Sequence, residues 1–386
     1  MERKMGGIMI TKIADNIISP LGYDSDANFK AVLSGETMLC KYDNTLGLPE
    51  SFCGSLLNRD EISTLANTEI ICAENYTLFE KLCILSAKNA ITNCNLSPRE
   101  SNVIFILSTT KGNVDCLENS LEDSRCLLAS SANKIARYFG NNNTPIVVSN
   151  ACISGVCAQI AAVRELLSGR YRYAVVIGCD VLSKFIISGF QSFKALSPEC
   201  CQPYDKDRVG LNLGEAAGTI ILKAGKPSNE QDWQYVSCSI HNDANHISGP
   251  SRTGEGSYRV LADILKDVDT NEIGFINAHG TATAYNDEME SIAIHRAGLD
   301  DVCVNGLKGY YGHTLGAAGI IETILSMKAI DNGVVLATRG FESTGTSYKL
   351  NISNEVRETS KSIFIKILSG FGGSNAGVSY RKGGNA

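Results

Sequence analysis

The sequence has little proline and none of the segments typical of secreted, membrane-spanning or nucleic-acid-binding proteins. Only 8 of its 386 residues are proline, against 36 glycines, which favours tight turns between packed elements over disordered linkers. No stretch approaches the roughly 20 apolar residues of a transmembrane helix. Glu2, Arg3, Lys4, Lys12 and Asp15 charge the amino-terminal segment, and no apolar signal core follows. The net charge of −6 provides no overall basic field for nucleic acid. We therefore expect no nucleic-acid partner and no membrane span.

The 14 cysteines lack the spacing of a metal site. No Cys-x-x-Cys pair occurs, and Cys200 and Cys201 are adjacent. Without a secretion signal, we expect a cytoplasmic protein whose thiols stay reduced. Most of these cysteines then serve as small buried hydrophobic residues, and we predict no bound metal.

Short apolar strands alternate with amphipathic helices, a pattern that predicts an α/β fold with buried strands. The predicted strands are Asn102–Ser108, Pro145–Ser149, Tyr173–Gly178, Ala217–Lys223, Tyr235–His241, Gly274–Ala278, Val302–Gly306 and Ser362–Ser369. The predicted helices are Asp26–Ser34, Thr77–Thr92, Ile153–Leu167, Tyr258–Leu265, Asp287–Ala297 and Gly316–Asn332.

The two halves of the chain resemble one another. The polar segment Gly225–Gln231 follows a strand and is the best internal boundary, so we predict two lobes, 1–226 and 227–386. In the first half a strand leads to Asn150-Ala-Cys152 and a helix of small residues. In the second half a strand leads to Lys308-Gly-Tyr-Tyr-Gly-His313 and another such helix. Each half thus places a reactive residue at a strand-to-helix turn, which indicates two duplicated lobes around one site.

Cys152 is a candidate nucleophile because it precedes the predicted helix from Ile153 to Leu167. The positive end of a helix dipole favours a thiolate, which is the reactive form of cysteine. Unpaired backbone N–H groups at the same turn can stabilise an oxyanion. On this segment alone, a buried structural cysteine is the alternative.

His279 and His313 are the two candidate catalytic histidines among only five in the chain. Each ends a strand or turn and is followed by small and hydroxyl residues, a pattern that suits an imidazole positioned at a cleft. Lys308 lies close in sequence to His313, and its positive charge would favour a neutral imidazole that can donate to an oxyanion. Each histidine could instead be structural. The others, His241, His246 and His295, are expected to be ordinary surface or packing residues.

Together these residues carry a resemblance to the Cys-His-His type of β-ketoacyl-acyl carrier protein synthase, within the thiolase-like superfamily. The motifs span nearly the whole chain in the same order as in that family. They are Ser19–Gly22, Asn150-Ala-Cys152-Ile-Ser154, Pro203–Arg208 with Leu213–Gly218, His279-Gly-Thr-Ala-Thr283 with Asp287 and Glu290, Lys308–His313, and Gly370-Phe-Gly-Gly-Ser-Asn375.

The resemblance implies a five-layered αβαβα thiolase-like fold, two duplicated lobes and a decarboxylating Claisen condensation. Cys152 would carry the acyl group, while His279 and His313 would bind the carbonyl of the malonyl thioester. Lys308 and Glu290 would support them. It also implies an oxyanion hole and acyl gate at Phe371 and Gly372, and contacts of Thr281 and Thr283 with the pantetheine arm.

The same resemblance implies that no cofactor is needed beyond the phosphopantetheine of acyl carrier protein. It implies acyl and malonyl thioester substrates and a homodimer, or else a heterodimer with a ketosynthase-like partner. Because carrier proteins are acidic, we expect docking at basic residues. The candidates are Lys134, Arg137, Arg170, Arg172, Lys206 and Arg208.

Other activities on this fold stay open at the level of sequence. An inactive chain-length partner typically lacks the cysteine, which this chain keeps, and an acyltransferase that forms esters or amides is a further alternative. A degradative thiolase would carry a second cysteine near Gly370–Asn375, and the Cys-His-Asn type would carry asparagine in place of His313.

Lys111 and the acidic segment Asn67–Glu80 depart from the family pattern. These departures favour a specialised enzyme of a polyene, polyketide or lipid side pathway over a housekeeping elongase of fatty acid synthesis.

Overall fold

The computed structural model describes residues 8–69, 75–118, 123–227 and 232–383. Ten strands form one continuous sheet in the order β11-β10-β14-β15-β9-β1-β8-β6-β4-β5. Its first half consists of β1 (Ile10–Ile18), β4 (Val103–Ser108), β5 (Ile146–Val148), β6 (Tyr173–Asp180) and β8 (Ala216–Ala224). Its second half consists of β9 (Trp233–Asn242), β10 (Ile273–Asn277), β11 (Cys303–Asn305), β14 (Ile363–Gly370) and β15 (Ser374–Lys382).

The two halves of this sheet have the same topology. Numbered along the chain within each half, the strands lie in the spatial order first, fifth, fourth, second, third. Each half also has an equivalent long helix in each of the same three connections. These are α3 (Leu78–Asn93), α4 (Leu128–Tyr138) and α5 (Ser154–Leu167) in the first half, and α7 (Glu255–Ile264), α8 (Ala284–Arg296) and α10 (Ala318–Asp331) in the second. The two halves join where β1 pairs with β9, at Thr11 with Gln234 and Lys12 with Trp233. The expected duplication of lobes is therefore present.

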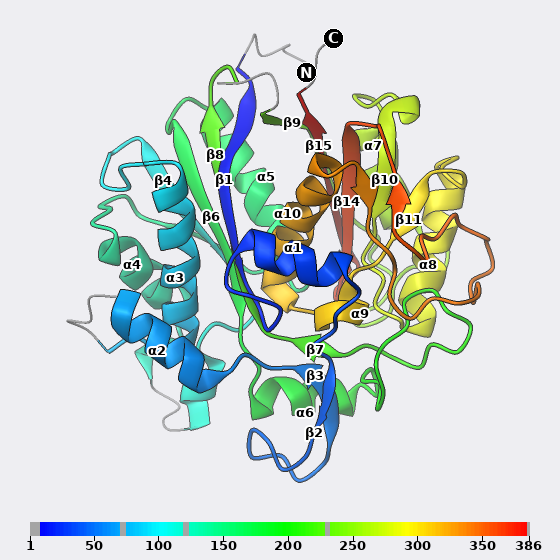
Figure 1. The fold of residues 1–386 in the computed structure, drawn as a ribbon, viewed down its shortest axis with the longest axis horizontal. Helices are drawn as coiled ribbons and strands as arrows, with labels where there is room; N and C mark the ends of the chain where they lie inside the picture. Colours follow the sequence, from blue (N-terminus) through cyan, green and yellow to red (C-terminus); the bar gives the residue numbers. More distant parts are fainter. Residues whose placement is uncertain (1–7, 70–74, 119–122, 228–231, 384–386) are drawn as a thin grey trace.

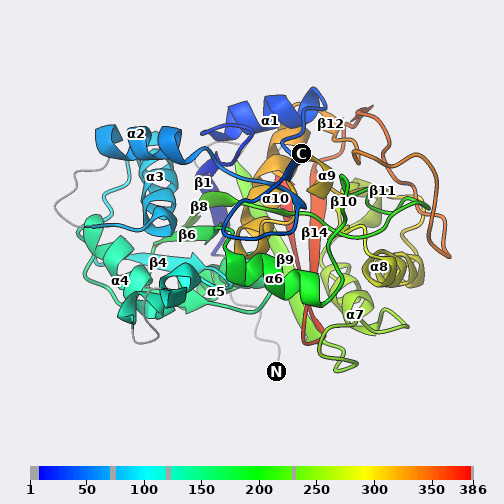
Figure 2. The ribbon, with the colours of Figure 1, turned by 90° about the horizontal axis from the view of Figure 1, so that it is seen from below.

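The elements stack as five layers, which confirms the expected αβαβα arrangement. In Figures 1 and 2, α3 and α4 cover one side of the first half-sheet, and α7 and α8 cover the far side of the second. Helices α5 and α10 lie between the two half-sheets. Three apolar clusters fill the spaces between layers, and the largest surrounds α5 and α10. Cys152 and His313 lie at turns that lead into these two central helices, whereas His279 lies at the turn between β10 and α8.

The remaining elements surround the main body. They are the helices α1 (Ser25–Leu33), α2 (Arg59–Glu69), α6 (Lys184–Ser192) and α9 (Lys308–Tyr311), and the strands β2 (Cys40–Tyr42), β3 (Phe52–Ser55), β7 (Leu213–Gly214), β12 (Val334–Val335) and β13 (Arg357–Glu358). Short 3-10 turns cover Val114–Glu118, Ser124–Cys126, Thr270–Glu272 and Leu315–Ala317. None of the helices in the described ranges is both long and apolar enough to cross a membrane. Every cysteine in those ranges is a free thiol.

The sequence predicted eight strands of the main sheet but missed β1 and β15. The boundary between the lobes stays a prediction, and its segment Gly225–Gln231 lies partly outside the described residues. The acidic segment Asn67–Glu80 is also only partly described.

Candidate active site

The turn that holds Cys152 connects β5 to α5. Ala151 adopts a left-handed backbone with φ of 46°, which is unfavourable for a residue with a Cβ atom. The Ser154 side chain closes the turn: its Oγ accepts from the Asn150 N–H at 2.7 Å and donates to the Ala151 carbonyl at 2.6 Å. The side chain of Cys152 is consequently fixed at the start of the helix, and the residue is only 7% exposed.

Small residues let α5 lie deep in the central layer, as the sequence predicted. The glycines Gly155 of α5 and Gly319 of α10 face each other where the two helices cross. A Cβ atom on Gly155 would lie 2.8 Å from the Cα of Gly319, so this close crossing depends on both glycines. The crossing places the starts of the two helices, and the turns before them, next to one another.

Cys152, His279 and His313 converge from three separate turns. Sγ of Cys152 and one ring nitrogen from each histidine all lie within 4.8 Å of one another. The two imidazoles meet edge to face, with ring centroids 5.0 Å apart and planes at 83°. Cys152 and His313 occupy equivalent turns of the duplicated lobes, since each follows the third strand of its half. The predicted catalytic set therefore exists as one cluster.

Glu290 holds the turn that carries His279. Its carboxylate accepts from the backbone N–H groups of His279 at 2.6 Å and Gly280 at 2.8 Å. The hydroxyl of Tyr204 also donates to it, at 2.9 Å. Burial raises the pKa of Glu290, although these hydrogen bonds act in the opposite direction. The supporting position expected for Glu290 is thus observed, whereas the contribution of Tyr204 was not predicted.

The backbone of His313 is held by the segment that includes β7. Its N–H donates to the Asn212 carbonyl at 2.7 Å, and its carbonyl accepts from Gly214 at 3.0 Å. A Cβ atom on Gly214 would lie 1.9 Å from the Tyr311 carbonyl, so only glycine fits there. The Nδ1 atom of His313 accepts from the Leu315 N–H at 3.3 Å, which places the proton of the neutral ring on Nε2. That buried Nε2 has no hydrogen-bond partner in the structure and is available to substrate.

Comparison with known proteins decides the family. Residues 72–227 match the protein family described as "Beta-ketoacyl synthase, N-terminal domain". Residues 234–342 match the family described as "Beta-ketoacyl synthase, C-terminal domain". Together the two matches cover more than half of the chain. The chain belongs to the β-ketoacyl synthase family.

Relatives of this synthase are found among both sequences and structures. It is 24% identical to 3-oxoacyl-[acyl-carrier-protein] synthase 2 of Vibrio cholerae, over 95% of this chain and 97% of the relative. It is 28% identical to nodulation protein E of Rhizobium leguminosarum, over 66% of this chain and 65% of the relative. A ketosynthase in complex with its chain length factor from Xenorhabdus doucetiae has the same fold, with a TM-score of 0.84 at 23% identity over 99% and 100% of the two chains. The synthase is accordingly a condensing acyltransferase.

Two lysines provide the positive charge behind the histidines of this synthase. Lys308 donates to the His279 carbonyl at 2.5 Å and to Glu322 at 2.9 Å. Lys366 donates to the Ala278 carbonyl at 3.1 Å and to the other oxygen of Glu322. Lys308 was predicted from the sequence, but Lys366 and Glu322 were not.

Both imidazoles are neutral in this environment. Burial is the main cause that lowers the pKa of His279 well below its usual value, and Lys308, His313 and Lys366 lower it further. Burial, Lys308 and Lys366 have the same effect on the pKa of His313. A neutral imidazole can donate a hydrogen bond to a developing oxyanion. The expected effect of Lys308 on His313 is therefore confirmed.

Burial of Cys152 acts against the effect of the helix N-terminus, which the sequence predicted to favour a thiolate. Burial raises the pKa of the Cys152 thiol to about 11, and the opposing charges of Lys308 and Lys111 do not offset it. The helix N-terminus does not outweigh the loss of water around the sulfur. Lys111 is half-buried, and its turn after β4 is the counterpart in the first lobe of the turn that carries His279. Lys111, which departs from the family pattern, therefore lies where its charge can lower the pKa of the Cys152 thiol.

Alkylation of Cys152 by a small neutral reagent should therefore accelerate steeply with pH. Because only the thiolate reacts, we expect the rate to rise about tenfold per pH unit from pH 7 to pH 10. The rate at Cys152 is measured by mass spectrometry of its peptide against time. A plateau below pH 9 would show that the thiol ionises far more readily than its burial indicates.

Phe371 lies in the β14–β15 turn, next to the turn that holds Cys152. A Cβ atom on the preceding Gly370 would lie 3.3 Å from the backbone nitrogen of Cys152, so the two turns are in close contact. The Phe371 side chain is 36% exposed and packs against Phe190 and Phe193, with ring centroids 5.9 and 5.5 Å away. Its gating role stays a prediction.

Three further residues were predicted to belong to the site, namely Gly372, Thr281 and Thr283. The N–H of Gly372 donates to the Ile247 carbonyl at 2.7 Å, so it is not a free oxyanion donor in this structure. Gly372 instead contributes a left-handed turn with φ of 85°. The hydroxyl groups of Thr281 and Thr283 bond to each other at 2.9 Å. Their contact with pantetheine remains a prediction.

A cysteine sulfur and two imidazoles are also common ligands of zinc. The expectation that the site holds no metal rests on sequence spacing and stays a prediction. Unchanged turnover after treatment with a chelator would support it, and lost turnover that zinc restores would contradict it.

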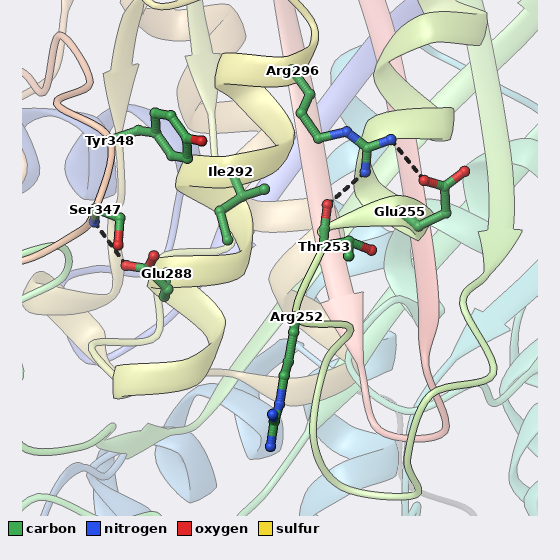
Figure 3. Close-up of a pocket in the computed structure, with 8 residues that line it drawn as sticks. All are labelled: Arg252, Thr253, Glu255, Glu288, Ile292, Arg296, Ser347 and Tyr348. Atoms are coloured by element: carbon green, nitrogen blue, oxygen red, sulfur yellow. Dashed lines mark hydrogen bonds and ion pairs between the residues drawn. The ribbon is translucent and has the colours of Figure 1, made fainter.

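A hollow of about 790 Å³ lies on the surface near α7 and α8, away from the catalytic cluster. Figure 3 shows Arg296 bound to the Thr253 carbonyl and to Glu255, while Arg252 extends away from them. None of its lining residues belongs to the cluster around Cys152.

Proposed function

We propose that this synthase joins an acyl group on Cys152 to a malonyl group on acyl carrier protein, with loss of carbon dioxide. The observation that carries the proposal is the convergence of one thiol with two neutral imidazoles. Such a site lacks a strong base but has two oxyanion donors. It suits a reaction in which decarboxylation, and not deprotonation, generates the carbanion.

In the first half-reaction, the sulfur of Cys152 attacks the acyl thioester and the carrier thiol leaves with a proton. The acyl group then stays on the enzyme as a thioester. Backbone N–H groups at the Cys152 and Phe371 turns are the proposed donors to the tetrahedral oxyanion. The carrier thiol departs, and malonyl carrier protein takes its place.

In the second half-reaction, the malonyl C–CO₂ bond breaks and its electron pair enters the thioester as an enolate. His279 and His313 donate hydrogen bonds to the enolate oxygen. The enolate carbon attacks the acyl carbonyl, and Cys152 leaves as a thiolate that regains a proton. The product is a β-ketoacyl carrier protein, two carbons longer.

The decisive experiment incubates the synthase with acyl carrier protein carrying an acyl group and with malonyl carrier protein. We expect one carbon dioxide per turnover and a carrier-bound product with two more carbons. Transfer of the acyl group to an alcohol or amine without carbon dioxide would instead indicate an ester- or amide-forming acyltransferase. No reaction unless a second ketosynthase subunit is added would indicate a chain-length partner.

A homodimer is the proposed assembly, formed through the exposed edge of β5. Ile146, Val147 and Val148 are apolar yet only half-buried, and β5 ends the ten-stranded sheet. An apolar edge strand of this kind is a ready template for pairing with another chain. Native mass spectrometry should give the mass of two identical chains; a monomer, or a stable complex only with a different chain, would contradict this assembly.

The surroundings of the six basic candidates support a choice among them for carrier docking. Arg208 does not suit the docking role expected from the sequence. Its side chain is only 7% exposed and donates to the carbonyls of Asp205 and Gly345. Lys134 pairs with Glu80, and Arg170 pairs with Glu165. Lys206 is exposed and lies two residues after Tyr204, which contacts Glu290 at the active site. We therefore propose Lys206 as a docking residue for the acidic carrier.

Reversal of the charge at Lys206 should weaken carrier-dependent turnover. For Lys206→Glu, we expect kcat/KM with malonyl carrier protein to fall about fivefold at low salt, with the difference shrinking as salt rises. Turnover with a small malonyl thioester should not change. Lys361→Glu, at an exposed position just before β14 and outside the docking candidates, is the matched control, and equal losses in both variants would remove Lys206 from the docking surface.

A further inference from the structure

Lys366 is a buried charge on a strand face that is otherwise apolar. It is 0% exposed and lies on β14 between Phe364 and Leu368, whose side chains belong to the central apolar cluster. The alternate residues Ile363, Ile365 and Ile367 belong to the outer cluster beneath α7. A lysine in the interior is costly unless its charge is compensated. Its presence therefore calls for a role that an apolar residue cannot fill.

The contacts of Lys366 form a symmetric arrangement with those of Lys308. Glu322 on α10 binds one lysine with each of its oxygens. The two ammonium groups then donate to consecutive carbonyls, Lys366 to Ala278 and Lys308 to His279. The backbone that carries the His279 imidazole is thus held by two cations linked through one carboxylate.

The charges of this cluster do not cancel. Burial alone would raise the pKa of Glu322, but Lys308 and Lys366 together lower it, so the carboxylate is ionised. The other groups facing Lys366 are Lys308, which repels it, and Glu290, which attracts it weakly. Burial lowers the pKa of Lys366 to about 8, which leaves it mostly protonated at pH 7. Within the trio of Lys308, Lys366 and Glu322, two cations and one anion leave one net positive charge, and Glu290 on the His279 N–H is the remaining acidic neighbour.

We infer that Lys366 is a positioning residue of the decarboxylation step, acting on the His279 backbone and supplying the second positive charge behind the imidazoles. This inference rests on the proposed function. Without Lys366, Lys308 and Glu322 would neutralise each other, and the field that keeps both imidazoles neutral and favours the enolate would weaken. The acylation of Cys152 does not require that field to the same extent, because its oxyanion is proposed to bind backbone N–H groups.

The test compares the two half-reactions in Lys366→Met, which keeps side-chain length without charge. We expect acylation of Cys152 within about twofold of the unmodified synthase. Carbon dioxide release from malonyl carrier protein by the pre-acylated enzyme should fall about tenfold or more in kcat, with little change in KM. Removal of a positive charge raises the pKa of both imidazoles, so the acidic limb of the decarboxylation rate should move to higher pH.

Two further variants keep the result interpretable. Lys361→Met, at an exposed position just before β14, should leave both half-reactions unchanged. If Lys366→Met does not fold, Lys366→Gln, which retains a donor for the Ala278 carbonyl, provides the same comparison. Decarboxylation at the original rate and pH dependence, or an equal loss of both half-reactions, would overturn the role of Lys366. Absence of carbon dioxide release by the unmodified synthase would instead overturn the proposed function.

Discussion

Replacement of Cys152 by alanine is expected to abolish condensation, with a loss of about 10⁴-fold or more in the rate of product formation. The acyl group would have no sulfur on which to form a thioester. Cys152 is the residue whose sulfur lies within 4.8 Å of a ring nitrogen of both His279 and His313, so its loss removes the proposed nucleophile from this cluster. Acyl transfer is followed as the mass of the intact protein after incubation with acyl carrier protein.

The control for this variant is Cys157→Ala, on the same helix. Cys157 is a buried thiol one turn further along α5, so its loss perturbs packing to a similar degree. We expect Cys157→Ala to keep acylation and condensation. Product formation by Cys152→Ala at more than a trace would require another nucleophile.

Loss of either histidine should mainly affect decarboxylation. His279→Ala or His313→Ala removes one of two oxyanion donors, which typically costs about 10²- to 10³-fold in rate. Acylation of Cys152 should persist in both variants, because the acyl thioester can form without binding a malonyl group. The measurement is carbon dioxide release from malonyl carrier protein by the pre-acylated enzyme.

His295→Ala is the matched control for the histidine variants. His295 pairs with Asp300 and stacks on Tyr348 at the surface. We expect it to decarboxylate at the original rate. Either His279→Ala or His313→Ala performing as well as this control would show that the imidazole in question does not hold the enolate.

The candidate catalytic residues were predictable because each occupies a recognisable turn. Cys152, His279 and His313 each follow a strand and precede a segment of small residues, and the resemblance assigned their roles. Their convergence could not be predicted from spacing alone. The turns of Cys152 and His313 meet through the close crossing of α5 and α10 at Gly155 and Gly319, and the pairing of β10 with β14 places the His279 turn within the same sheet.

The residues that the sequence analysis missed, Lys366, Glu322 and Tyr204, are buried and contact the site through ion pairs or hydrogen bonds. Lys366 interrupts an apolar strand, and this break in the pattern was the available signal. Its partner Glu322 lies in α10, a helix that is buried on nearly all sides. In such a helix the sequence does not show which neighbouring element an acidic side chain faces. Tyr204 was part of a family motif, but only the structure shows its hydroxyl bound to Glu290.

Two opposing effects on the Cys152 thiol could not be weighed from the sequence. The position before α5 favours a thiolate, whereas burial raises the pKa of the thiol to about 11. The extent of that burial depends on how segments far apart in the chain pack around the turn, and the spacing of residues does not give it.

The most direct test of the account is the identity of the residue that becomes acylated. The synthase is incubated with acyl carrier protein carrying an acyl group, digested, and each cysteine peptide is measured by mass spectrometry. We predict that the acyl mass appears on the peptide containing Cys152 and disappears when malonyl carrier protein is added. Acylation of another thiol, such as the buried Cys201 beside Lys308, with Cys152 unmodified, would contradict the account.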